Sequence, residues 1–278
     1  MTEVRRFSVG SVRLTRVPYF DVTLPPEAVA LDEAEIRALP WAVGTWCASP
    51  TEVRVGQVFW VIESAGRTIV VDPCCASDAF LRTGPEARDH QDAAFAAFRA
   101  AGFDPDTVDV VVMSHLDGIG MNALVDAGGD WEPAFAHAPV VLSEREWDKT
   151  RARADQPDAA ALLALHAQGA VTPVPLPHRL TSEVEMVESG GHSPGHATVI
   201  VRSRGARALF LGHLAVSPMQ AALDRPFALH DDEELGGRAL RHWLEDAASD
   251  NALVIGPLWP TPGAARVRTT PLELVPAR

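Results

Sequence analysis

The sequence lacks a long apolar run. None of its 278 residues belong to a stretch that approaches the ~20 consecutive apolar residues of a membrane-spanning helix. The first six residues, MTEVRR, lead into an alternating, strand-like pattern and not into the apolar core of a signal peptide. We therefore expect no membrane span and no membrane partner.

Excess positive charge is also missing. Lys and Arg together number 24 against 37 Asp and Glu, which gives a formal net charge of −13. Such a surface repels phosphate backbones and anionic lipids. Nucleic acid is therefore excluded as an expected partner, and a small-molecule substrate is favoured.

Cysteine is scarce. The three cysteines are Cys47, Cys74 and Cys75, an odd number in which two are neighbours in the chain. Adjacent cysteines do not easily bridge each other, so the pattern indicates a reducing, cytoplasmic location and not a disulfide framework. We expect all three to act as small buried apolar residues.

Linkers and low-complexity tracts are absent, and 47% of the residues are hydrophobic. A chain of this length can bury one large core, so we predict a single domain over residues 1–278. Apolar periodicity predicts strands that alternate with helices along most of the chain. The predicted strands include 7–17 (a hairpin), 57–64, 67–72, 108–112, 138–142, 181–188, 197–202, 208–211 and 252–255, the last strand; the predicted helices include 92–101, 144–153, 158–168 and 233–248.

Polar side chains follow several of the predicted strands. His115 and Asp117 come directly after the β-branched run 108–112, His192 and His196 follow strand 181–188, and His213 follows strand 208–211. Strands hold the loops at their ends in fixed positions, and metal sites are often built from such loops. A lone histidine is more often a hydrogen-bonded structural residue, so this pattern alone is weak.

The loop motifs resemble those of the metallo-β-lactamase superfamily. Residues 114–120, SHLDGIG, resemble its Ser/Thr-His-x-His-x-Asp-His signature, and residues 191–196, GHSPGH, resemble its Gly-His-Thr-Pro-Gly-His. Residues 70–73, 209–213 and 257–260 resemble its Val-Asp-Thr-Gly, Thr-Gly-Asp and Ser-His-Phe-Pro segments. The resemblance is nearest to lactonase-like and organophosphate-hydrolase-like members, with a degenerate metal motif. It implies an α/β fold, the αββα sandwich, in which two mixed sheets pack face to face with helices outside.

The resemblance also implies a ligand set. His115, Asp117 and His192 occupy one set of metal positions, and His213 stands where the family has a bridging aspartate. Two imidazoles and one carboxylate suit a catalytic zinc site with an open position, or the facial triad of non-haem iron enzymes. With His213 as a fourth donor, a closed tetrahedral zinc site is the alternative. The remaining interpretation is that no metal binds and the exchanges record drift after loss of function.

The second metal set of the family has been replaced. Ile119, Gly120 and Leu258 stand where the family has an aspartate and two histidines, and none of the three side chains binds a metal. We expect these positions to line a dry apolar pocket that receives an apolar part of the substrate.

Two further residues take supporting roles by the same resemblance. Asp72 is expected to orient a ligand histidine, and His196 is expected to support the site without binding the metal. The irregular segment 19–55 is expected near the active-site mouth or at a subunit interface, which leaves a homodimer open.

The predicted function is a divergent enzyme of this fold with at most one divalent transition metal ion, acting on a small organic molecule. Zinc is the favoured ion, with iron or manganese as alternatives. Asp117 and His213 are the candidates for proton transfer. Because Ile119 cannot accept a proton, a cyclisation, an elimination or a metal-centred oxidation stands beside hydrolysis. The alternative is an inactive, metal-free member that binds a small ligand or a protein partner.

The replaced second set makes a stoichiometric prediction. Purified protein should hold at most one tightly bound transition metal ion per chain, because Ile119, Gly120 and Leu258 offer no ligand atoms. Elemental analysis of dialysed protein measures this ratio. A ratio of two per chain would contradict the assignment of these positions.

Overall fold

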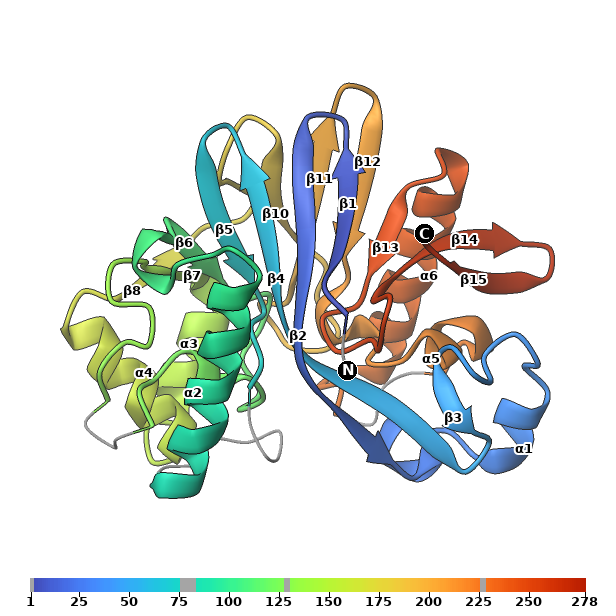
Figure 1. Ribbon diagram of the computed structural model, residues 1–278, viewed down its shortest axis with the longest axis horizontal. Coiled ribbons are helices and arrows are strands. Elements are labelled where there is room, and N and C mark those ends of the chain that lie inside the picture. The colour runs from blue at the N-terminus through green and yellow to red at the C-terminus, as the bar shows by residue number, and fades with distance from the viewer. Residues whose placement is uncertain (1–2, 76–83, 128–130, 226–228) are drawn as a thin grey trace.

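The computed structural model describes residues 3–75, 84–127, 131–225 and 229–278, and within them two β-sheets form the centre of the molecule (Figure 1). The first sheet has the strand order β1-β2-β4-β5-β6-β7-β8, with β3 paired to β4. Its strands are β1 (Arg5–Val9), β2 (Val12–Leu24), β3 (Cys47–Ser49), β4 (Glu52–Ser64), β5 (Arg67–Val71), β6 (Val110–Val112), β7 (Val140–Ser143) and β8 (Val171–Val174). Strands β5 to β8 run parallel and the others antiparallel, so the sheet is mixed.

The second sheet has the order β15-β14-β13-β12-β11-β10-β9. Its strands are β9 (His178–Arg179), β10 (Val184–Glu188), β11 (Ala197–Ser203), β12 (Ala206–Phe210), β13 (Leu253–Ile255), β14 (Ala264–Thr269) and β15 (Leu272–Pro276). It is mixed as well, because β12 and β13 pair in parallel while the other described neighbours are antiparallel.

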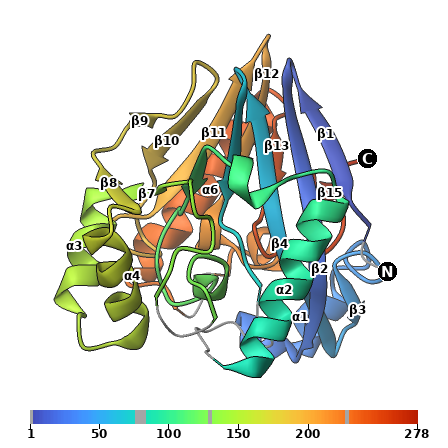
Figure 2. The same ribbon diagram turned by 60° about the vertical axis from the view of Figure 1, so that its left-hand side comes forward.

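Helices cover the outer face of each sheet, as Figures 1 and 2 show from two directions. The first sheet carries α2 (Pro85–Ala100), α3 (Glu144–Ala152) and α4 (Pro157–Ala167); the second carries α1 (Glu33–Arg37), α5 (Pro218–Leu223) and α6 (Glu233–Ser249). Short 3-10 turns are η1 (Pro26–Val29), η2 (Pro105–Thr107), η3 (Met121–Ala123) and η4 (Gly212–Leu214). The predicted αββα sandwich is confirmed. No helix among the described residues is long and apolar enough to cross a membrane.

The core between the sheets explains why several strands read as continuous apolar runs. Trp60 of β4 packs edge-on against Phe210 of β12, with ring centroids 5.6 Å apart. Other residues of this layer, such as Val58 and Ile255, are fully buried. The opposite face of the first sheet is also covered, because Phe59 packs against Phe95 and Phe98 of α2. A strand that is covered on both faces needs apolar residues at every position and does not alternate.

The topology gathers the loops at two opposite ends of the sandwich. The hairpin turns β1–β2, β4–β5 and β11–β12 lie together at one end, the top of Figure 1. Strands β5, β6, β10, β12 and β13 all run away from that end. The loops that follow β6, β10 and β12, which carry the candidate histidines, therefore meet at the other end.

Strands β3, β8 and β9 were not predicted from the sequence, and the structure departs from the sequence expectation in three further places. Residues 252–255 are not the last strand, because β14 and β15 follow. Only four residues of these two strands are buried and two of them are alanines, so the alternating pattern is weak. Helix α2 begins at Pro85 and not at residue 92. The sequence did not predict its first turns because they are polar and largely exposed, so they show no apolar periodicity. Segment 19–55 is more regular than expected, because β2 and β4 extend into it and pair Leu24 with Val53.

The inter-sheet layer should dominate stability. Replacing buried Phe210 by alanine should lower the free energy of unfolding by about 3–5 kcal/mol, because it leaves a cavity between the sheets. Replacing Phe20, which is 46% exposed on β2, should cost less than about 1 kcal/mol. Chemical denaturation of the two variants measures both values, and equal losses would contradict the layer assignment.

Candidate metal centre

Four side chains meet where the ends of both sheets come together. His115 and Asp117 lie in the loop after β6 of the first sheet. His192 lies in the loop between β10 and β11, and His213 lies in η4, directly after β12 of the second sheet. The site therefore lies between the sheets, and its geometry depends on how they pack.

One carboxylate oxygen stands at the centre of this group. Asp117 Oδ2 is 3.0 Å from His213 Nδ1, 3.4 Å from His115 Nε2 and 3.4 Å from His192 Nε2. His115 Nε2 and His213 Nδ1 are 2.8 Å apart. The four ligand atoms all lie within 4.8 Å of one another, so the group could hold a metal ion.

Burial sets the protonation states of the group. The three histidines are at most 3% exposed, whereas the side chain of Asp117 is 12% exposed. Burial, together with His213, lowers the pKa of His115 to about 3, and burial also lowers the pKa of His192. Burial alone would raise the pKa of Asp117, but His115 and His213 hold it well below its usual range. These shifts favour neutral imidazoles at His115 and His192 and an ionised carboxylate at Asp117, the forms in which these side chains bind metals.

Asp72 supports His115 through a serine. The backbone N–H and the hydroxyl of Ser114 each donate to Asp72, at 2.7 Å. Since the Ser114 proton points to the carboxylate, its oxygen is left to accept from His115 Nδ1, 2.8 Å away. This arrangement puts the lone pair of His115 on Nε2, toward the other three side chains. Burial raises the pKa of Asp72 to about 6, against the lowering effect of its bonds from Ser114.

His196 is fully buried behind the group. Its Nδ1 is 2.7 Å from the Ser189 hydroxyl, and its ring centroid is 5.3 Å from that of His115. It does not belong to the four-residue group, and its Nε2 has no hydrogen-bond partner among the described residues. A Cβ on Gly212 would lie 2.3 Å from this nitrogen, so the η4 backbone runs directly against His196.

Comparisons with known proteins support the architecture. The dizinc quorum-quenching lactonase AidC is similar with a TM-score of 0.79 at 17% identity, covering 99% of this chain and 97% of that one. The hydrolase AbOPH, described as a member of the beta lactamase superfamily, is similar with a TM-score of 0.77 at 14% identity, covering 100% and 98%. A probable metal-dependent hydrolase from Staphylococcus aureus gives 0.71 at 13% identity, covering 94% of each chain. The chain has the metallo-β-lactamase fold. No family model and no curated protein matches the sequence.

Within the metallo-β-lactamase fold, the three replaced positions are packed in different ways. Gly120 has a φ of 84°, and a Cβ there would lie 2.7 Å from the Pro73 carbonyl oxygen. The backbone of residue 73 therefore lies where a side chain at position 120 would begin. Ile119 and Leu258 pack in the apolar cluster of the second sheet, and Leu258 is 6% exposed. That these positions line a substrate pocket remains a prediction.

Cys74 lies beside Gly120, one of the three replaced positions. Its thiol donates to Gln57 Oε1 at 2.8 Å, and the Gly120 N–H bonds to its sulfur. Burial, reinforced by Asp117 and Asp72, raises the pKa of the thiol to about 12. Cys74 is thus a protonated donor here and not a thiolate ligand. Cys47 and Cys75 are buried as well, and none of the three cysteines forms a disulfide among the described residues.

The sequence analysis did not identify His230. Its Nδ1 is 3.1 Å from His192 Nδ1, and the neighbouring backbone N–H of Asp231 donates to the His192 carbonyl. If His192 donates its Nδ1 proton to His230, the lone pair of His192 lies on Nε2, toward Asp117. No sequence motif predicts this residue, because His230 reaches the site only through the packing of residues 230–232 against residues 191–192.

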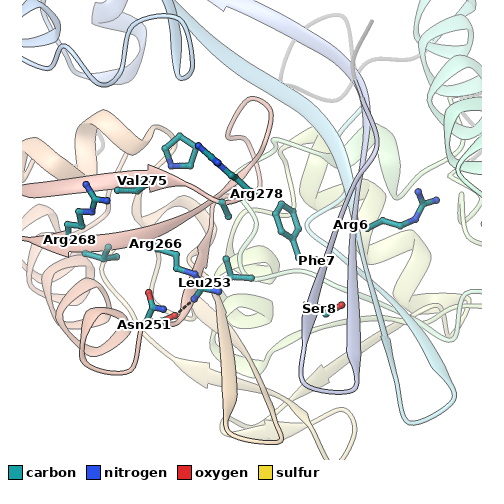
Figure 3. A pocket seen from close by; sticks show the side chains of 12 residues that line it. Arg6, Phe7, Ser8, Asn251, Leu253, Arg266, Arg268, Val275 and Arg278 are labelled. Carbon is teal, nitrogen blue, oxygen red and sulfur yellow. Dashed lines mark hydrogen bonds between the residues drawn. The ribbon is translucent and has the colours of Figure 1, made fainter.

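A separate cavity of about 550 Å³ lies between β1 and the C-terminal strands (Figure 3). Its lining includes four arginines, yet their side chains spread in different directions in Figure 3. Arg6 donates to the Ala101 carbonyl, Arg266 donates to the Asn251 carbonyl, and Arg268 contacts Glu273. The cavity does not bring reactive groups together, so the candidate site stays with the four-residue group.

Replacing either of the two histidines of the GHSPGH loop should lower the metal content of the protein to a different extent. Replacing His192 by alanine removes a donor atom of the group and should cost most of the bound metal, whereas His196→Ala should cost far less. Elemental analysis of both variants beside exposed His242→Ala measures this. Equal metal losses from the His192 and His196 variants would mean that the wrong histidine of the loop was assigned.

Proposed function

We propose that this chain is a metal-dependent enzyme that holds one divalent transition metal ion at His115, Asp117 and His192, with His213 beside the open fourth position, and acts on a small organic substrate. The observation that carries the proposal is the convergence of the four ligand atoms within 4.8 Å in a buried site. Zinc is the favoured ion, since imidazole and carboxylate ligands suit it.

The donor geometry fits such an ion. Ligand atoms at 2.0–2.1 Å from a tetrahedral zinc ion lie about 3.3 Å from one another. The separations around Asp117 Oδ2 are 3.0, 3.4 and 3.4 Å, close to that value, whereas His115 Nε2 and His213 Nδ1 are closer, at 2.8 Å. The pKa shifts of His115 and Asp117 favour the forms that bind a cation.

The side chains of the site then have different roles in the proposed reaction. When bound, a divalent ion supplies Lewis acidity and lowers the pKa of water. Asp117 is the most exposed of the four side chains, so substrate approaches on its side. Its Oδ1 accepts the Ile119 N–H at 2.9 Å, which holds the carboxylate in place, and its Oδ2 is 3.0 Å from His213 Nδ1. His213, 3.0 Å from Asp117, is therefore the candidate for proton transfer at the open position, with Asp117 as the alternative.

Hydrolysis is the reaction that the structural neighbours suggest. One of them is described as a dizinc lactonase with a bound homoserine product and another as a hydrolase. This chain differs at Ile119, which offers no carboxylate to orient a second water, so a cyclisation or an elimination is the non-hydrolytic version of the proposal.

The alternative is an inactive scaffold that binds a ligand without metal. One observation favours it: three of the four side chains bond to one another, with His115 and His213 2.8 Å apart and His213 3.0 Å from Asp117. Buried polar groups that are paired in this way need no ion to satisfy them.

Zinc-loaded and chelated protein separate the two functions. We expect zinc-loaded protein to turn over at least one member of a panel of small esters, lactones, β-lactams and phosphotriesters, and Asp117→Asn to lose that activity while exposed His242→Ala keeps it. Nitrocefin and simple lactones should be poor substrates, because the two-ion chemistry has no second ligand set. Rapid, chelator-sensitive hydrolysis of either would contradict the assignment, and protein that binds no zinc would support the scaffold.

A further inference from the structure

Glu146 is a buried carboxylate whose position the proposed reaction does not explain. It lies in the first turn of α3 and is 0% exposed. Lone carboxylates are seldom fully buried, because the charged form loses its hydration. The groups around Glu146 must therefore stabilise its carboxylate.

Three donors surround this carboxylate. Oε1 accepts the backbone N–H of Leu116 at 3.0 Å. Oε2 accepts the Ser193 hydroxyl at 2.6 Å and the Gly195 N–H at 3.2 Å. All three groups donate, so the ionised carboxylate, which only accepts, is the form that fits them. The N-terminal end of α3 stabilises the same negative charge.

The donors come from the two loops that form the candidate metal centre. Leu116 stands between His115 and Asp117, which belong to the first sheet, and Ser193 directly follows His192, which belongs to the second. Each oxygen of Glu146 thus holds one loop. The carboxylate is a bridge of fixed length between the two halves of the site.

The first turn of α3 strengthens the hold on the His192 loop. Ser143, the N-cap residue, accepts the Glu146 N–H at 3.0 Å and donates its hydroxyl to the Gly195 carbonyl at 2.7 Å. A Cβ on Gly195 would lie 2.2 Å from the Glu146 nitrogen, so the loop lies directly against the helix. The contact leaves no room for the loop to shift toward α3.

We propose that Glu146 is a positioning residue that fixes the separation of His192 from His115 and Asp117 and thereby sets the metal affinity of the site. The inference rests on the proposed function, because it needs an ion that these residues bind. Groups that orient metal ligands from behind typically change metal affinity about 10–100-fold when they are replaced.

The test compares Glu146→Gln with Glu144→Gln. Both changes remove one negative charge from the first turn of α3, but Glu144 is exposed. A glutamine at position 146 keeps one acceptor oxygen and turns an NH₂ group toward the donors of one loop. Zn²⁺ titration by calorimetry gives the affinity, and the visible spectrum of bound Co²⁺ reports the ligand geometry.

We expect Glu146→Gln to weaken Zn²⁺ binding about 10–100-fold and to alter the Co²⁺ spectrum, with Glu144→Gln within about a factor of two of the unmodified protein. Equal affinities and spectra for the two variants would overturn the role of Glu146 and leave the proposed function intact. An unmodified protein that binds neither ion would instead overturn the proposed function.

A second variant covers the case in which Glu146→Gln does not fold. Ser193→Ala removes only one of the three donors, and circular dichroism of the metal-free protein checks that it folds. It should also weaken Zn²⁺ binding and alter the Co²⁺ spectrum, with a smaller effect than that expected for Glu146→Gln. Unchanged affinity and an unchanged spectrum in a folded Ser193→Ala protein would count against the bridge.

Discussion

The site depends on one buried negative charge. Asp117 Oδ2 lies within 3.4 Å of nitrogen atoms from three imidazoles that are almost fully buried. A carboxylate at such a place is stable only if its neighbours replace the lost hydration. His115 and His213 supply part of that replacement, which is why the pKa of Asp117 lies well below its usual range although burial opposes this. The position of each histidine is therefore tied to the same oxygen atom, and the loops of both sheets must meet around it.

Close backbone packing makes this meeting feasible. Gly191 has a φ of 83°, and a Cβ there would lie 2.3 Å from the Cα of Gly236 in α6. Gly212, with a φ of 55°, brings the η4 turn against the ring of His196. In both places the absence of a side chain lets one loop reach the depth at which its histidine faces Asp117. Asp72 completes the support from the other sheet, because it fixes Ser114 and, through it, the tautomer of His115.

The sequence predicted most of the fold because most strands are covered on both faces and read as apolar runs. It missed β14 and β15, where few positions are fully buried and two of these are alanines, so the hydrophobic pattern is weak. The four residues of the candidate centre were named from motifs, and the structure brings them together. His230 and Glu146 were not named, since each reaches the site by tertiary contacts between segments far apart in the chain. The spacing of motifs along the sequence does not predict such tertiary contacts. The proximity of Pro73 to Gly120 was also hidden, because it depends on a backbone angle that the sequence alone does not reveal.

The four-residue group and the replaced second-metal positions differ in their packing. This difference is relevant to whether the site was adapted to one ion or lost its metal function. On one side, the resemblance implies that a carboxylate and a histidine exchanged places, and Asp117 and His213 lie 3.0 Å apart. On the other side, ligand atoms have given way to neutral packing. Gly120 lies against the Pro73 carbonyl, Cys74 is a protonated thiol bonded to Gln57, and Leu258 lies in the apolar cluster next to buried Trp259. Random loss would leave unpaired buried donors on both sides, which is costly. Here one side keeps converging donors, and the residues at the other positions offer no ligand atom, which supports the proposed single-ion site.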